Sequence, residues 1–106
     1  MELNCLLSFS EIYRQSFIHL EDRKEFIAVR PVETFQLFDE FTVFSYYDCE
    51  TLKWTDHITG CSIGINITKN EIIEKIEKIG KKAYWDKIKR HLRKYPFSPA
   101  YRLEIQ

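Results

Sequence analysis

Hydrophobic and polar residues alternate with a period of two along the N-terminal part of the chain, as they do in half-buried β-strands. In residues 16–31 two such runs flank the charged segment 21–24, which predicts a hairpin whose second strand ends at Pro31. Residues 41–58 repeat the pattern around a polar turn at 48–51, which predicts a second hairpin.

One further strand is predicted over 62–67, with Ile63, Ile65 and Ile67 on one face. The segment 32–40 fits a single helical turn and a strand equally well, and the pattern alone leaves its structure open.

Beyond these strands the hydrophobic period changes to that of an α-helix, and a helix is predicted over about 69–79. Thr68 and Glu71 have the spacing of a capping box, in which each side chain accepts a hydrogen bond from the other's backbone N–H. Gly80 is placed to end the helix with a left-handed backbone conformation. The hydrophobic positions of this helix are Ile72, Ile76 and Ile79.

A second helix is predicted over about 81–95, stopped by Pro96. At 100° per residue its hydrophobic stripe consists of Trp85, Ile88, Leu92 and Tyr95, with Tyr84 beside it. Sharing that stripe makes Trp85 a predicted core residue rather than a platform for stacking bases. The candidate partner-binding residues are Lys82, Lys89, Arg90, Arg93 and Lys94 on the opposite side, and Lys87, which flanks them.

The C-terminal segment 100–105 alternates as a last short strand would. With no internal repeat and no linker, residues 1–106 are interpreted as one domain. The predicted fold class is α+β: a largely antiparallel sheet of about four to six strands, with both helices packed on one of its faces.

Charge is distributed unevenly along a chain whose 16 basic and 16 acidic residues cancel overall. Residues 1–68 hold 5 basic and 11 acidic residues, a net charge of −6, and residues 69–80 are neutral. Residues 81–106 hold 8 basic and 2 acidic residues, a net charge of +6. Such asymmetry within a small domain favours an anionic partner.

Three anionic partners fit this asymmetry. An acidic protein surface would use Arg90 and Arg93 as anchors. Nucleic-acid phosphates are the alternative, and the acidic half of a second copy of this chain is the third. A DNA-reading helix-turn-helix is excluded, because Ile76 would occupy a position that needs a small residue and Asp86 one that should be buried.

Catalytic and metal-binding patterns are weak in this sequence. Asp56, His57 and Cys61 are the only residues that resemble a nucleophile–base–carboxylate set, but neighbours in a strand point to opposite faces, so no local relay is expected. Cys5, Cys49 and Cys61 have no zinc spacing with the histidines and are expected to remain thiols in a reducing compartment. No catalytic residue, metal or cofactor is therefore predicted.

These patterns lead us to expect a non-enzymatic cytoplasmic protein that binds a macromolecular surface. Its size and its lack of a catalytic set suggest a small regulator or inhibitor of the kind that phages and mobile elements encode. The alternative is a nucleic-acid-binding module acting through helix 81–95, and a small-ligand-binding protein or hydrolase is the third hypothesis. Tyr46 and Tyr47 are the candidates for an exposed aromatic ligand or partner surface. No membrane association is expected.

Overall fold

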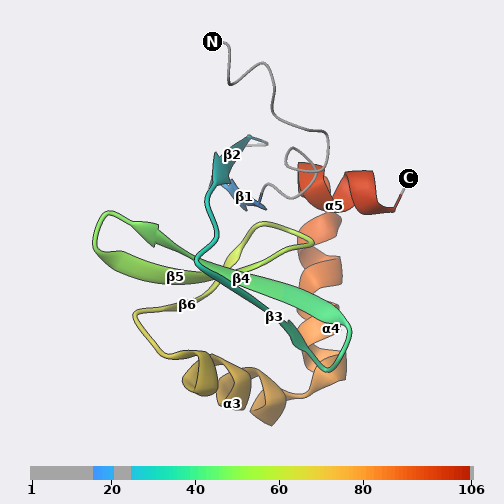
Figure 1. Ribbon diagram of the computed structural model, residues 1–106. Coiled ribbons are helices and arrows are strands. Elements are labelled where there is room, and N and C mark those ends of the chain that lie inside the picture. Colours follow the sequence, from blue (N-terminus) through green and yellow to red (C-terminus); the bar gives the residue numbers. More distant parts are fainter. Residues whose placement is uncertain (1–15, 21–24, 106) are drawn as a thin grey trace.

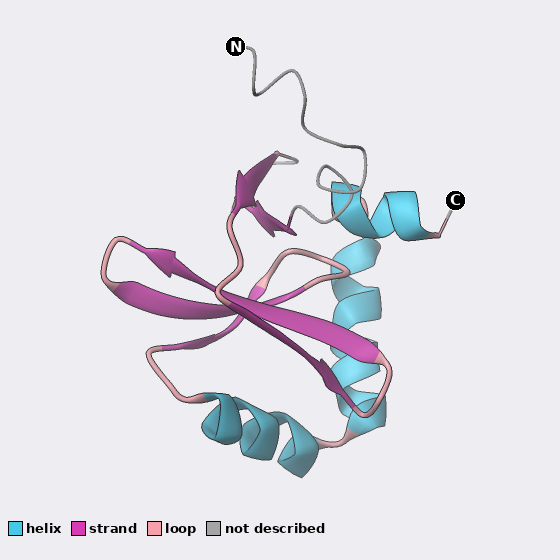
Figure 2. Ribbon diagram, viewed as in Figure 1, coloured by secondary structure: helices cyan, strands magenta, loops and turns pink. Residues whose placement is uncertain are grey.

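The computed structural model of the protein describes residues 16–20 and 25–105. These residues form six strands in two antiparallel sheets and three helices, which confirms the predicted α+β fold (Figures 1 and 2). In Figure 1, α3 (Lys69–Ile79) lies below the larger sheet, whereas β1 (Ser16–His19), β2 (Phe26–Val29) and α5 (Pro99–Glu104) lie above it.

The smaller sheet is the first predicted hairpin. Strand β1 (Ser16–His19) pairs with β2 (Phe26–Val29) in an antiparallel register that sets Ser16 opposite Val29. The turn predicted at 21–24 lies outside the described residues.

The larger sheet has the strand order β3-β4-β5-β6. Strands β4 (Phe41–Asp48) and β5 (Thr51–Asp56) form the second predicted hairpin. The segment 32–40, whose structure the sequence pattern did not decide, contains strand β3 (Glu33–Leu37), followed by a tight turn into β4. Strand β6 (Ser62–Ile65) pairs with β5 and completes the sheet.

A bulge in β6 overturns part of the isoleucine prediction. The register against β5 shifts just after Trp54, so that Gly64 pairs with Trp54 and Ile63 is the extra residue. Ile63 is buried, whereas Ile65 is 54% exposed, and the two do not share a buried face. Gly64 lies close to the helix layer: a Cβ there would lie 2.4 Å from Cδ1 of Ile72, so a larger residue would have to displace the end of that side chain.

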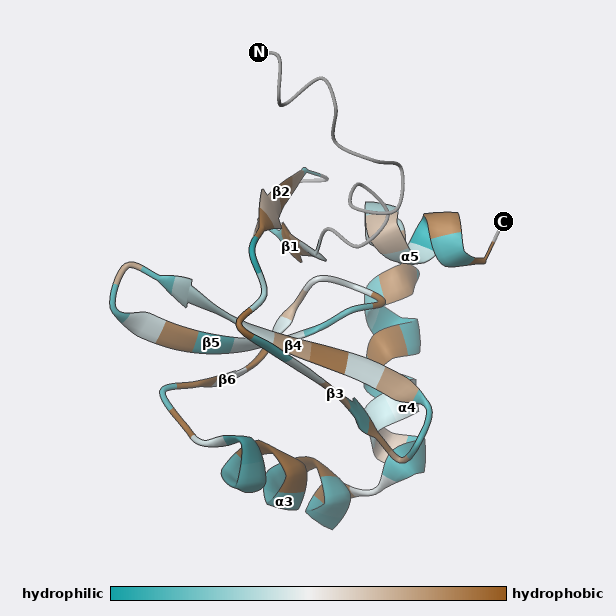
Figure 3. Cartoon of the chain, viewed as in Figure 1, coloured by the Kyte–Doolittle hydropathy of each residue, from teal (hydrophilic) through white to brown (hydrophobic). Residues whose placement is uncertain are grey.

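Helix α3 (Lys69–Ile79) begins and ends where the sequence predicts. Thr68 and Glu71 form the reciprocal capping box, and Gly80 ends the helix at a φ of +90°. Its hydrophobic side faces the larger sheet (Figure 3), where Ile72 and Ile76 are buried.

Helix α4 (Lys81–Leu92) ends three residues earlier than predicted. It is also rotated about its axis relative to the prediction, so that Tyr84 lies on its buried side. Tyr84 and Ile88 are 2% and 4% exposed, while Trp85 is 37% exposed. The prediction that Trp85 is a core residue was therefore wrong. The reason is a partner in the sheet: Tyr84 brings its hydroxyl to the buried carboxylate of Asp56, and this contact fixes the rotation of the helix.

The predicted strand at 100–105 was also wrong, because residues 99–104 form helix α5 (Pro99–Glu104). Pro99 stands in the first turn, where proline favours a helix, and Ser98 precedes it in the N-cap position. Ser98 donates its backbone N–H to the carbonyl of Ile58 at 2.8 Å, which holds the start of α5 against the loop after β5.

A hydrophobic core lies between one face of the larger sheet and helices α3 and α4. The buried residues of this core are Leu37, Phe41, Val43, Trp54, Ile58, Ile63, Ile72, Ile76, Tyr84 and Ile88. On β4, Phe44 and Tyr46 alternate with the core residues and are buried on the opposite face of the sheet.

Candidate functional site

The outer side of α4, continued by the two residues that follow it, carries all six basic residues that the sequence singled out. We call this surface the basic face, and each of its side chains is exposed to solvent. Burial of Tyr84 and Ile88 against the sheet leaves this side of the helix outward. The residues of the basic face are Lys82, Lys87, Lys89, Arg90, Arg93 and Lys94.

Asp86 is the one acidic residue of α4, and it neutralises part of the basic face. Lys82 and Lys89 approach its carboxylate at 3.2 and 3.4 Å. The hydrogen bond from Lys82, followed by the charges of both lysines, lowers the pKa of Asp86 below its ordinary value. The other four basic residues of the face make no ion pair with any residue that the structure describes.

The basic face is contoured and partly aromatic. A shallow hollow of about 500 Å³ opens among Ala83, Asp86, Lys89, Arg90 and Arg93. Beside it, the partly exposed ring of Trp85 lies 5.9 Å from Nζ of Lys89, within the range of a cation–π contact. The surface therefore combines charge with an apolar side chain.

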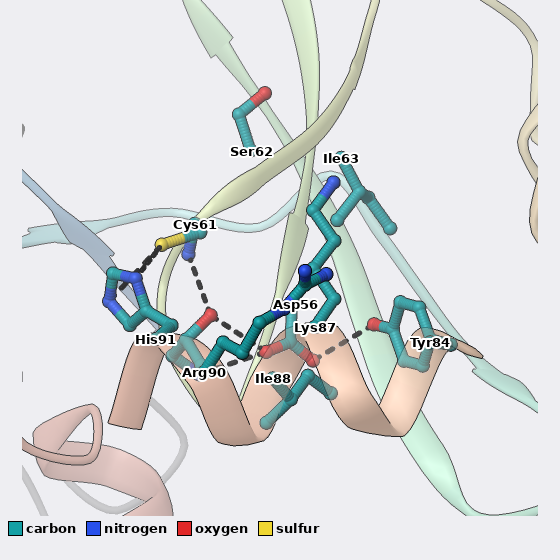
Figure 4. Close-up of a pocket in the computed structure, with 10 residues that line it drawn as sticks. Asp56, Cys61, Ser62, Ile63, Tyr84, Lys87, Ile88, Arg90 and His91 are labelled. Atoms are coloured by element: carbon teal, nitrogen blue, oxygen red, sulfur yellow. Dashed lines mark hydrogen bonds between the residues drawn. The ribbon is translucent and has the colours of Figure 1, made fainter. Parts of the chain in front are cut away.

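A buried carboxylate fixes α4 against the end of β5. Asp56 pairs with Val43 in the β-ladder, so its side chain lies on the core face of the sheet. It accepts hydrogen bonds from the hydroxyl of Tyr84 at 3.0 Å and from the hydroxyl of Thr59 at 2.8 Å (Figure 4). Burial raises the pKa of Asp56, and the hydrogen bonds from Thr59 and Tyr84 oppose that rise.

The same carboxylate shapes the turn that follows β5. The backbone N–H of Thr59 donates to the Asp56 carboxylate at 3.0 Å. The backbone N–H of Gly60 donates to the backbone carbonyl of Asp56 at 2.7 Å. Asp56 also donates its N–H to the carbonyl of Cys61 at 2.9 Å. This turn directs the Cys61 side chain toward α4.

Cys61 meets His91, which lies two helical turns after Tyr84 on α4. The Cys61 Sγ lies 3.5 Å from Nδ1 and 3.4 Å from Nε2 of the imidazole (Figure 4). Since these distances are nearly equal, Sγ lies over the ring plane; an equidistant position in the plane would place Sγ against Cε1. Burial, and then the neighbouring His19, lowers the pKa of His91, which favours the neutral imidazole.

His19, at the end of β1, completes a three-residue cluster with Cys61 and His91. One donor atom from each residue lies within 4.8 Å of the others. The backbone N–H of His19 donates to the carbonyl of Gly60 at 2.9 Å, and a Cβ at Gly60 would lie at that same distance from this nitrogen. His19 Nε2 is buried and has no hydrogen-bond partner among the described residues.

A cavity of about 360 Å³ opens between this cluster and the buried carboxylate. Lys87 and Arg90 of the basic face rise from α4 along its rim (Figure 4). Its inner walls include Asp56, Cys61, Tyr84, Ile88 and His91.

The other residues weighed from the sequence lie apart from this arrangement. His57 pairs with Glu104 of α5, while Asp56 faces the core, so the two neighbours diverge as their alternation requires. Tyr47 is 57% exposed, but Tyr46 is only 7% exposed, and the prediction that both form an exposed aromatic surface was wrong for Tyr46. Its side chain points to the covered face of β4, where its ring lies 6.4 Å from that of Phe44.

Comparison with protein-family models, curated proteins and solved structures finds no match to this chain. Within the described residues, no helix combines the length and hydrophobicity that crossing a membrane requires.

Proposed function

We propose that this protein is a non-enzymatic cytoplasmic binding protein, a small regulator or inhibitor, whose basic face docks on an acidic surface of a partner protein. The observation that carries this proposal is the group of four exposed basic residues that lack an acidic partner among the described residues. These residues are Lys87, Arg90, Arg93 and Lys94.

The contrast with α3 supports this proposal. Lys69 of α3 pairs with Glu33 at 3.3 Å, and Lys75 donates to the carbonyl of Ile63 at 3.1 Å. The three basic residues of residues 69–80 are balanced by three acidic ones, which is the ordinary pattern of a solvated helix. On α4 the excess charge is concentrated on one side, where it would raise the association rate with an acidic surface.

The composition of the basic face favours a protein partner over nucleic acid. Asp86 lies within the face and would repel a phosphate, whereas a protein surface can offer it a donor. Trp85 and Arg90 belong to the residue types that dominate binding energy at protein interfaces. The hollow beside them offers a place for a partner side chain.

The geometry around Cys61 supports a non-enzymatic role. A histidine base accepts a thiol proton through a lone pair in the plane of its ring. The Cys61 sulfur lies over the ring of His91 in this structure. In either ring orientation, the carboxylate of Asp56 is bound by Thr59 and Tyr84 and does not orient His91 as a base.

A comparison of two anionic probes tests the choice of partner. Fluorescently labelled poly-L-glutamate and a labelled 20-base-pair duplex are titrated with the protein, and anisotropy is followed from low salt to about 0.15 M. We expect tighter binding to the acidic polypeptide at about 0.15 M salt. Tighter binding to the duplex, with a log–log salt slope near −4 from about four neutralised phosphates, would instead establish the nucleic-acid alternative.

A further inference from the structure

We propose that His19, Cys61 and His91 form a binding site for Zn²⁺. The three residues come from the end of β1, the turn after β5 and the last part of α4. Imidazole nitrogens and a thiolate sulfur are the ligands that zinc prefers in proteins, and three protein ligands leave a fourth position for water or a bound group.

One separation between donor atoms is close to that in a tetrahedral zinc site, and the others are no longer than 4.8 Å. With zinc bonds of about 2.3 Å to sulfur and about 2.05 Å to nitrogen, tetrahedral angles place sulfur and nitrogen about 3.6 Å apart. Cys61 Sγ lies 3.4 and 3.5 Å from the two nitrogens of His91. The third donor, from His19, is within 4.8 Å of both, so a small side-chain movement completes the set.

Coordination requires rotation of the His91 ring, whose centroid lies 4.8 Å from that of Tyr95 and 5.1 Å from that of His19. A metal lies in the plane of the imidazole that binds it, whereas the Cys61 sulfur lies over the plane of His91. Among the described residues, Cys61 is the only hydrogen-bond partner of the His91 ring. Rotation about the bond from Cβ to the ring therefore breaks no other hydrogen bond of that ring within the described residues.

The ligands are positioned by a rigid backbone, which is what a metal site needs. Gly60 allows the chain to pass close enough for His19 to donate its N–H to the Gly60 carbonyl, which fixes the end of β1 beside the turn. The hydrogen bond from Tyr84 to Asp56 holds α4 against the end of β5. It thereby positions His91, which is also on α4, beside Cys61.

The buried Nε2 of His19, which has no hydrogen-bond partner among the described residues, is the independent sign of a ligand. Burying a ring nitrogen without a hydrogen bond costs free energy, and native structures satisfy the large majority of such groups. Coordination by His19 Nε2 would satisfy this atom, while its backbone already holds the residue in place.

A bound ion would fasten the smaller sheet to the helix layer. Strand β1 and α4 are far apart in the sequence, and the ion would join them through three bonds. On binding, the Cys61 thiol would lose its proton to solvent, so binding should release close to one proton at neutral pH. The metal-bound protein should also unfold at a higher temperature than the metal-free protein.

Titration with Co²⁺, a spectroscopic substitute for Zn²⁺, tests the site. We expect one ion per chain, a sulfur-to-cobalt charge-transfer band in the near ultraviolet, and displacement of Co²⁺ by one equivalent of Zn²⁺. Because loss of outer-shell partners alone weakens metal binding 10–100-fold, Cys61→Ser, His91→Ala and His19→Ala should each weaken binding by about 100-fold or more.

The chain supplies matched controls for these variants. Cys49 is exposed and His57 pairs with Glu104, so Cys49→Ser and His57→Ala should bind Co²⁺ as the wild type does. A second measurement on the wild type does not depend on the variants folding: Zn²⁺ should protect Cys61, but not Cys49, from alkylation as read by peptide mass spectrometry. No thiolate band in the wild type, or equal alkylation of Cys61 with and without Zn²⁺, would overturn the proposal.

Discussion

The hydroxyl of Tyr84 donates a hydrogen bond of 3.0 Å to the buried carboxylate of Asp56 and thereby joins α4 to the end of β5. Both residues are almost fully buried, at 2% exposure each. Burial and the adjacent carboxylate raise the pKa of Tyr84, so its hydroxyl keeps its proton at neutral pH and can donate. This contact sets which side of α4 faces the sheet, and therefore which side carries exposed charge.

Removing the hydroxyl should destabilise the protein. In Tyr84→Phe the ring still fills its place, but the Asp56 carboxylate loses one of the three hydrogen bonds that it accepts from Tyr84 and Thr59, and we expect a loss of about 1–3 kcal/mol in the free energy of unfolding. The measurement is denaturant unfolding followed by circular dichroism. Tyr47→Phe is the matched control, because Tyr47 is exposed and should show no change. Equal midpoints for Tyr84→Phe and the wild type would mean that this contact does not fix the helix.

Asp56 should make stability depend on pH with an unusual sign. Its raised pKa means that the folded protein retains the carboxyl proton to a higher pH than the unfolded chain does. The stability that Asp56 contributes is therefore complete below about pH 3.8, the ordinary value, and is lost as pH rises through the raised pKa. Unfolding free energies of wild type and Asp56→Asn, measured from pH 4 upward, should differ by an amount that falls with pH, at most about 1.4 kcal/mol per pH unit.

Asp86→Asn supplies a flat control for this pH series. The pKa of Asp86 is lowered by Lys82 and Lys89, so its contribution is lost only as pH falls below the ordinary value of 3.8, and from pH 4 upward the difference from the wild type should stay nearly constant. A difference between wild type and Asp56→Asn that grows with pH would contradict the assignment of a raised pKa to Asp56.

Substituting alanine for two hydrophobic residues of α4 tests which side of the helix is buried. Ile88 is 4% exposed within the core, while Leu92 is only partly buried at its edge. We expect Ile88→Ala to cost about 2–5 kcal/mol and Leu92→Ala to cost clearly less. Denaturant unfolding of the two variants gives the comparison. A larger loss for Leu92→Ala would restore the helix orientation predicted from the hydrophobic stripe.

Local patterns were sufficient to predict most of the elements. The capping box of Thr68 and Glu71 and the glycine at position 80 bound α3, and these signals act within a few residues. The prediction for α4 failed because a residue far away in the sequence determines which side of the helix is buried. The rotation of α4 depends on Asp56, and the segment after Ser98 alternates like a strand although Pro99 begins a helix.

The candidate sites differ in the same way. The basic face could be predicted, because a helical period and a charge count need no tertiary contact. The cluster of His19, Cys61 and His91 was missed, because its members are separated by 42 and 30 residues and do not form a short sequence motif. The sequence offered one usable signal, Gly60 next to Cys61, which has a φ of +78° and permits the close approach of β1.

Charge reversal on the basic face is the most direct measurement of the proposed function. The triple variant Lys87→Glu, Arg90→Glu and Arg93→Glu changes three exposed residues that have no ion pair among the described residues. Its control reverses Arg30, Lys78 and Arg102, which are also exposed but are spread over the molecule. Both variants change the net charge equally, and circular dichroism checks that both are folded.

The dissociation constant of each variant for labelled poly-L-glutamate, measured by anisotropy at about 0.15 M salt, then tests whether binding depends on the basic face. Three exposed ion pairs at roughly 0.5 kcal/mol each amount to about a tenfold loss, and reversal adds repulsion, so the basic-face variant should bind at least about tenfold more weakly than the control. Equal dissociation constants for the two variants would contradict the account, because binding would then depend on total charge and not on this face of α4.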